Sequence, residues 1–152
     1  VLATICDLTI AGESAVFGQA GPRMGSVDPG FGTNLLARHV GQKKAKEIWF
    51  LCRQYSAQEA MDMGMVNAVV PDAQLDAEVR RWCDEILQMS PTAIALGKRA
   101  FNAETESIRG LSNLGNIAVR LYYDSPEGRE GERAFRAKRK PQFRKAAAKK
   151  KR

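Results

Sequence analysis

Apolar positions along the chain follow two spacings, one typical of strands and the other of helices. Residues 2–10 are apolar except for two threonines and one aspartate, which predicts a buried strand. Residues 15–17 predict a second, short strand, and residues 65–70, closed by Pro71, predict a third. The strands lie mainly in the first half of the chain.

Helical spacing dominates the remainder. It predicts helices over residues 35–40, 43–55, 57–63, 75–89, 91–101 and 107–123, and a last one that begins at Ser125. Gly41 is a natural end for the first of these, and Ser56 with Glu59 forms a capping box at the start of the third. Early strands followed by helices indicate an α/β chain that ends in a helical segment.

Residues 17–32 form a glycine-rich loop, with five glycines and two prolines in sixteen positions. Glycine permits backbone conformations and close approaches that a side chain would block, and proline stiffens the segment between them. Ordering such a loop costs entropy, so we expect a fixed shape with a functional purpose. Its polar side chains, Gln19, Arg23, Ser26 and Asp28, are the first candidates for a site.

The charge is distributed unevenly. The chain has 152 residues and a net charge of +7, but ten of its 24 Lys and Arg residues lie within residues 136–152, where there is no acid. The preceding residues are therefore mildly acidic. Residues 144–152 are predicted to be a disordered basic tail, although such a tail also permits nonspecific binding of nucleic acid. A non-catalytic nucleic-acid-binding module thus remains an alternative, with no evidence beyond charge.

The cysteines indicate the cellular compartment of the protein. Cys6, Cys52 and Cys83 are widely spaced and are predicted to be buried thiols in a reducing compartment, which favours the cytoplasm. With His39 as the single histidine, a metal site is not expected.

The apolar run at the start of the chain is too short to span a membrane. The chain begins inside this run and without a methionine, so we expect it to be a piece of a longer protein.

Two stretches resemble the crotonase (enoyl-CoA hydratase/isomerase) superfamily: residues 6–19 and residues 56–67. The resemblance implies the α/β crotonase (ClpP-like) fold, represented by the C-terminal part of its β/α core and its helical trimerisation segment. It implies a core part over residues 1–103, a helical segment over 104–143 that covers the active site and contacts other subunits, and the tail over 144–152.

Residues 18–32, 41–55 and 127–141 more particularly resemble the 1,4-dihydroxy-2-naphthoyl-CoA synthases, lyases of menaquinone and phylloquinone biosynthesis. These enzymes close a ring in o-succinylbenzoyl-CoA by an intramolecular Claisen (Dieckmann) condensation. The alternative is a hydratase or isomerase of the same superfamily. Hydratases usually place glutamates in the loop region, and residues 17–32 contain none.

The resemblance implies a role for each candidate residue. Ser26 and Asp28 hold the electrophilic carboxyl group, with a protonated Asp28 as proton donor, and Tyr123 places the substrate and carries a proton. Tyr123 is expected to reach the site of a neighbouring subunit, within trimers paired into hexamers. Phe135 and Lys138 match positions that bind the adenine and a phosphate of CoA.

The base is implied by a residue without a side chain. One branch of the family has an aspartate where this chain has Gly21, and the other recruits bicarbonate. Gln19, the Gly21 backbone and Trp49 would then bind that anion, although Trp49 alone is more often a core residue. The oxyanion hole is expected upstream of Val1, so we predict that residues 1–152 alone are inactive.

Overall fold

The computed structural model describes residues 1–148. Its strands are β1 (Ile10–Gly12), β2 (Val16–Gly18), β3 (Gln54–Ser56) and β4 (Ala68–Val70). Its helices are α1 (Leu2–Ile5), α2 (Gly21–Met24), α3 (Phe31–Val40), α4 (Gln42–Leu51), α5 (Ala57–Asp62), α6 (Leu75–Leu87), α7 (Pro91–Ala103), α8 (Leu111–Tyr123), α9 (Pro126–Arg136) and α10 (Phe143–Ala148). Short 3₁₀ turns occupy η1 (Asp72–Gln74) and η2 (Glu106–Ile108).

The strands form two small sheets. In the first, β1 pairs with β4 in parallel and places Ile10 opposite Ala68. In the second, β2 pairs with β3 in the antiparallel direction and places Phe17 opposite Tyr55. A parallel pair needs a long crossover, and here the crossover contains β2, β3 and helices α2 to α5. The glycine-rich loop is therefore held inside this crossover.

Two apolar clusters stabilise the crossover. The first joins α5 to β1 and contains Ala11, Ala57, Ala60 and Val66. The second joins α3, α4 and β3 and contains Leu36, Ala45, Ile48 and Tyr55. Leu36 and Ile48 are the largest fully buried side chains, and burial of each contributes about 1.5–3 kcal/mol. The second cluster thus fixes α3 against α4, directly beside the loop.

Several predicted boundaries are confirmed. Helix α3 ends at Gly41, which adopts a φ of 79°. The capping box is complete, because the Ser56 hydroxyl accepts from the Glu59 amide at 3.2 Å and the Glu59 carboxylate accepts from the Ser56 amide at 2.7 Å. The Glu59 carboxylate also accepts from the Ser56 hydroxyl at 2.9 Å, and the bonds from the Ser56 amide and hydroxyl to this carboxylate lower the pKa of Glu59. Local capping residues therefore predicted the end of α3 and the start of α5 correctly.

Two predicted elements are wrong. Residues 2–10 do not form one strand, because residues 2–5 are helical and the Thr4 hydroxyl donates back to the Val1 carbonyl at 2.7 Å. A short apolar run cannot by itself distinguish a helical turn from a strand. The helix predicted over 43–55 ends at Leu51, because Cys52 adopts a left-handed φ of 49° and the chain then pairs with β2.

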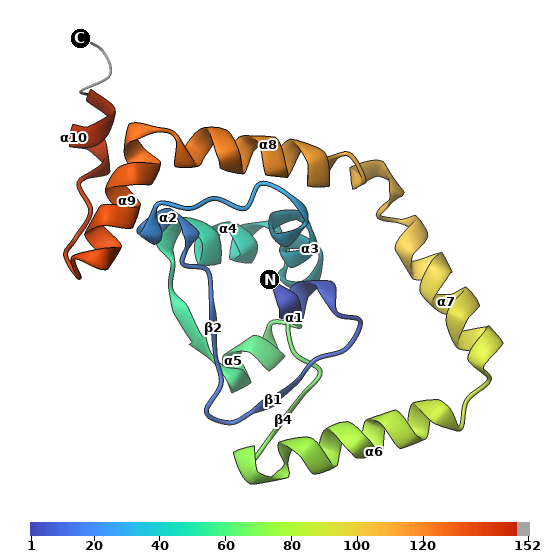
Figure 1. The fold of residues 1–152 in the computed structure, drawn as a ribbon. Coiled ribbons are helices and arrows are strands. Elements are labelled where there is room, and N and C mark those ends of the chain that lie inside the picture. The colour runs from blue at the N-terminus through green and yellow to red at the C-terminus, as the bar shows by residue number, and fades with distance from the viewer. Residues whose placement is uncertain (149–152) are drawn as a thin grey trace.

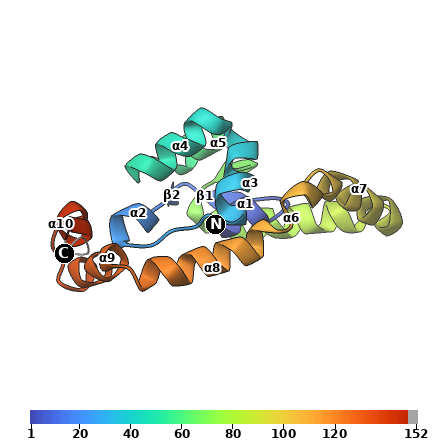
Figure 2. The same ribbon diagram turned by 90° about the horizontal axis from the view of Figure 1, so that it is seen from above.

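Helices α6, α7 and α8 form an outer arch around the two sheets (Figure 1). Turned by 90°, the molecule has α8 on one side of the segment that follows α2 and α4 on the other (Figure 2). The apolar face predicted for residues 75–89 is present, but Val79, Ile86 and Leu87 are exposed on it. Polar contacts tie the arch inward, including the Lys98–Asp7 ion pair and a bond from the Arg38 guanidinium to the Glu104 carbonyl.

Two predictions about the chain's surface also need correction. Residues 144–148 of the expected disordered tail are helical, as part of α10, and the rest of that tail, 149–152, lies outside the described residues. Among the thiols only Cys52 is buried, whereas Cys6 and Cys83 are exposed. No described helix combines the length and the apolar character that crossing a membrane would require.

Candidate active site

The segment from Gly25 to Gly30 joins α2 to α3 and carries the two polar side chains of interest, Ser26 and Asp28. It begins where α2 ends, at Gly25, whose left-handed φ of 76° turns the chain. The Ser26 amide donates to the Gly21 carbonyl at 2.8 Å, which closes the turn. We call residues 25–30 the site loop. Its start is fixed by backbone hydrogen bonding and does not depend on a side chain.

Two contacts between glycines hold the site loop against the C-terminal helices. A Cβ on Gly25 would lie 2.6 Å from the Gly131 Cα of α9, and a Cβ on Gly115 of α8 would lie 3.1 Å from the Gly30 Cα. Backbones approach this closely only when side chains are absent. Gly115, in the middle of α8, therefore has a packing role.

Between these two contacts, Tyr123 reaches the loop. Its hydroxyl lies 2.9 Å from the Ser26 hydroxyl, and either oxygen can donate. Tyr123 was expected to reach a neighbouring subunit. In the structure, α8 instead returns it to Ser26 of its own chain, because the outer arch leads α8 back across the loop. The pairing of Ser26 with Tyr123 is therefore made within one chain.

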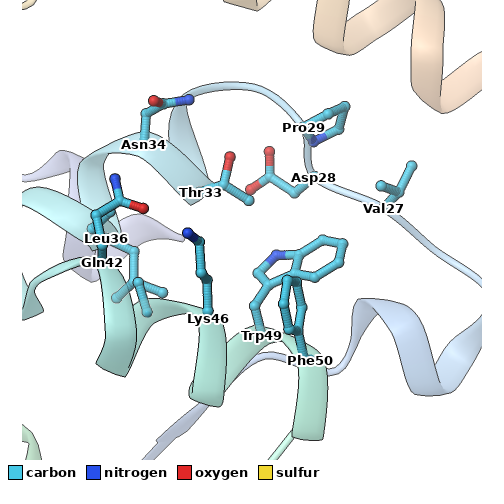
Figure 3. Close-up of a pocket in the computed structure, with 12 residues that line it drawn as sticks. Val27, Asp28, Pro29, Thr33, Asn34, Leu36, Gln42, Lys46, Trp49 and Phe50 are labelled. Carbon is cyan, nitrogen blue, oxygen red and sulfur yellow. The ribbon is translucent and has the colours of Figure 1, made fainter.

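A cavity of about 270 Å³ lies between the site loop and helices α3 and α4 (Figure 3). The Asp28 carboxyl group, the Trp49 indole and the Lys46 amine face this space in Figure 3. The lining also includes Val27, Pro29, Thr33, Asn34, Leu36, Ala37, Gln42, Ala45 and Phe50. It is a largely apolar cavity with a few polar groups, the usual composition of a small-molecule site.

Two buried polar atoms at this cavity, Asp28 Oδ2 and Trp49 Nε1, have no hydrogen-bond partner among the described residues. The other carboxyl oxygen of Asp28 accepts from the Gly30 amide at 3.3 Å. Gly32 packs so close to Asp28 that a Cβ there would overlap the carboxyl group. Buried polar groups are almost always paired with protein, ordered water or a ligand, so these two atoms mark the cavity as a candidate binding site.

The three residues expected to bind bicarbonate are brought together only in part. Trp49 lines the cavity of about 270 Å³ with Asp28, whereas Gln19 lines a separate one of about 140 Å³ with Arg23 and Cys52. A Cβ on Gly21 would lie 3.2 Å from the Ser26 carbonyl oxygen, so Gly21 packs directly under the site loop. The described geometry thus places Gln19 and Trp49 in different cavities.

A third cavity, of about 700 Å³, lies between α2 and the end of α9. It brings together Phe135 and Lys138, the two residues expected to bind CoA, and adds Arg23, Arg139 and Lys140. Several cationic groups around an exposed aromatic ring suit a phosphorylated, ring-containing ligand. Arg23 was a candidate only as a polar residue of the glycine-rich loop, and Lys140 belonged to the basic run of residues 136–152. Their place beside Phe135 and Lys138 could not be predicted, because only the fold brings α2 to this segment.

The comparisons with known proteins agree with this architecture. The family profile described as enoyl-CoA hydratase/isomerase matches residues 1–146, nearly the whole chain. The chain belongs to this family. Membership confirms the expected crotonase superfamily and its α/β fold.

Solved structures of the family resemble the chain closely. An enoyl-CoA hydratase from Mycobacterium avium subsp. paratuberculosis K-10 is 31% identical, with a TM-score of 0.84. An enoyl-CoA hydratase/isomerase from Pseudoalteromonas atlantica T6c is 26% identical, with a TM-score of 0.85. A methylmalonyl-CoA decarboxylase in complex with 2-nitronate-propionyl-CoA is 30% identical, with a TM-score of 0.77.

The match covers most of this chain but only part of each relative. It covers 92–93% of this chain but 55–59% of those three proteins, so this crotonase-family chain spans little more than half their length. The named relatives carry out different reactions on CoA thioesters. The family therefore does not by itself select a reaction, and the residue roles and the division at residues 103 and 143 stay predictions.

Proposed function

We propose that the protein containing this chain is an acyl-CoA enzyme. Its specific reaction would be the intramolecular Claisen condensation of o-succinylbenzoyl-CoA to 1,4-dihydroxy-2-naphthoyl-CoA. The observation that carries the proposal is that Asp28 and Trp49 line the same cavity. Each has a buried polar atom that lacks a hydrogen-bond partner among the described residues. A hydratase would need acid–base carboxylates, and Asp28 is the single carboxylate lining this cavity among the described residues.

The reaction needs a donor that makes a carboxylate electrophilic. When the carbanion formed beside the thioester attacks the free carboxyl group of the substrate, a carbon–carbon bond forms and one carboxyl oxygen must leave as water. Two protons are needed for that oxygen to leave as water: the substrate's carboxyl group would bring one by being bound in its protonated form, and a protonated Asp28 would give the other. The Ser26 and Tyr123 hydroxyls bond to each other at 2.9 Å, and the one that accepts in that bond would donate its own hydrogen bond to the leaving oxygen. Tautomerisation then gives the aromatic diol.

The proposed base is bicarbonate, which when bound would accept the proton beside the thioester. The Trp49 indole N–H fits this anion, because it is a buried donor without a partner among the described residues. Gly21 fits too, because it carries no carboxylate of its own. Gln19 fits less well, since it lines a separate cavity. The support for this part of the proposal therefore comes mainly from Trp49.

The third cavity supports CoA as the carrier. Phe135 is largely exposed within reach of a planar ring, and Lys138 lies among further cationic side chains that could pair with phosphates. In this proposal the nucleotide end of CoA occupies the cavity between α2 and α9, and the acyl end reaches the site loop. Assembly into trimers and hexamers, as in the naphthoyl-CoA synthases, belongs to the same proposal.

The decisive experiment follows naphthoyl-CoA formation from o-succinylbenzoyl-CoA by the natural protein that carries this sequence, in bicarbonate-free buffer and with bicarbonate added. We expect turnover that rises with bicarbonate. In Gly21→Asp the new carboxylate should supply a base, so turnover should no longer depend on bicarbonate, at a reduced rate because of the 3.2 Å contact with Ser26. Gly97→Ala, on a helix position with open space, is the control.

The outcomes separate the parts of the proposal. No product under either condition overturns the condensation, and hydration of an enoyl-CoA by the same protein would assign it to the alternative reaction. Product formation that is insensitive to bicarbonate in the unchanged protein overturns the role given to Gly21 and Trp49.

A second prediction concerns Tyr123. Replacing it by phenylalanine keeps the ring and removes the hydroxyl that lies 2.9 Å from Ser26. We expect kcat to fall at least tenfold, roughly the effect of losing one hydrogen bond to a developing charge, with little change in melting temperature. Tyr122→Phe, at the preceding position of α8, is the control and should keep its activity. Equal kcat values for the two variants would contradict the role of Tyr123.

A further inference from the structure

The strongest unexplained feature outside the site loop is a buried acid, Glu130 of α9. The residue is only 7% exposed, and both of its carboxylate oxygens are used. Oε1 and Oε2 accept from the Arg139 guanidinium at 2.6 and 3.0 Å, and Oε1 also accepts from the Gln142 amide at 2.9 Å. These contacts, the Arg139 bond first, lower the pKa of Glu130 to about 2.

Both partners of this acid belong to the turn that follows α9. The turn has the hydrogen bonds of a Schellman motif, with the Lys138 amide donating to the Phe135 carbonyl and the Arg139 amide to the Ala134 carbonyl, each at 3.0 Å. The left-handed position of this motif normally holds glycine. Here it holds Lys138, with a φ of 49°.

A left-handed lysine costs roughly 1–2 kcal/mol relative to an ordinary backbone conformation, so its surroundings must hold it there. The two-point bond from Arg139 to Glu130 fixes the residue directly after Lys138, and the Gln142 amide fixes the chain three residues later. Arg139 also donates to the Lys140 carbonyl at 3.1 Å. The strained residue is thus enclosed by contacts that meet at one carboxylate.

The turn forms one wall of the third cavity. Lys138, Arg139 and Lys140 line that wall together with Phe135, and α2 forms the opposite wall. Glu130 is not among the lining residues and contacts the turn instead. Gly131, the next residue, seats α9 on Gly25 at the end of α2. One turn of α9 therefore sets the position of both walls.

We propose that Glu130 is a positioning residue for the nucleotide end of an acyl-CoA ligand: its two-point bond to Arg139 holds Lys138 in the left-handed conformation that presents this cation to the third cavity. The inference rests on the proposed function, since it takes that cavity to hold the nucleotide of CoA. The strain at Lys138 is then explained by the ligand, because a glycine would fit the turn better but has no cationic side chain to pair with a phosphate.

The test compares two ligands, CoA and pantetheine, which lacks the nucleotide. Their binding to the natural protein is measured by calorimetry for the unchanged sequence and for Glu130→Gln, with Glu132→Gln as control, since Glu132 makes an exposed ion pair with Arg136 on the same helix. We expect Glu130→Gln to weaken CoA binding roughly tenfold and to leave pantetheine binding unchanged. The control should bind both ligands normally.

A second pair of variants distinguishes a loss of positioning from a loss of the fold. Arg139→Lys keeps the charge opposite Glu130 but loses the two-point contact, so CoA binding should weaken by a smaller factor, about threefold. Arg136→Lys is its control, because the exposed pair with Glu132 survives as a lysine contact. An equal loss for CoA and pantetheine would mean a purely structural role for Glu130 and would overturn the inference.

The remaining outcomes separate this inference from the proposed function. Preference for CoA over pantetheine that survives in both Glu130→Gln and Arg139→Lys overturns the positioning role alone. An unchanged protein that binds CoA no more tightly than pantetheine overturns the assignment of the third cavity, and the positioning role with it.

Discussion

Asp28→Asn is expected to lower kcat for the condensation by at least a hundredfold, the lower end of the effect of a positioned general acid. The amide has the same shape as the carboxyl group and can still accept from the Gly30 amide, a contact now 3.3 Å long. It cannot give up a proton to the leaving oxygen. The fold should tolerate the change, because Gly32 leaves the same space for either group.

The measurement is a comparison of kcat with the melting temperature. Asp62→Asn is the matched control, because that carboxyl group is exposed and its contact with Gln58 can be kept by an amide oxygen. Near-normal turnover in Asp28→Asn with bicarbonate present would show that the proton comes from elsewhere. Loss of activity together with a melting temperature many degrees lower would point to damage to the fold.

Gly131→Ala should have the largest effect on stability. A Cβ at this position would lie 2.5 Å from the Gly25 nitrogen, so either α9 or the end of α2 must move. Overpacking of this kind costs about 1–3 kcal/mol, more than the gain of up to about 1 kcal/mol from replacing glycine in a helix. Because Gly25 begins the site loop, turnover should fall at least tenfold as well.

Urea unfolding of a graded series checks this explanation. Gly97→Ala meets open space and should be neutral or stabilising, since only the helix propensity changes. Gly115→Ala meets Gly30 at 3.1 Å and should fall between the two. If Gly131→Ala were as stable as Gly97→Ala, the close packing of α9 on the site loop would be wrong.

The sequence predicted those features that depend on neighbouring residues. The capping box at Ser56 and the end of α3 at Gly41 needed only local rules, and both are confirmed. The glycine-rich loop was identified as the place for a site, and the structure puts Ser26 and Asp28 there, Asp28 at a cavity. Short motifs indicated the superfamily, and the family comparison confirms it.

The features that the sequence did not predict depend on distant contacts. Strand β3 pairs with the distant strand β2 and places Tyr55 opposite Phe17, whereas residues 54 and 55 had the local pattern of a continuing helix. Arg23 lines the third cavity because α2 lies close to α9 in the fold. The exposed apolar face of α6 had the spacing of a buried helix, and spacing alone does not say what covers it.

The hydrogen bond between Ser26 and Tyr123 joins residues 97 positions apart. Closing so long a loop costs more entropy than forming the turns and the capping box, so this contact should form late in folding. It also depends on the arch, whose helices expose many apolar side chains. Opening of the arch should therefore separate the two hydroxyls while the sheets stay folded, so activity would be lost before cooperative unfolding begins.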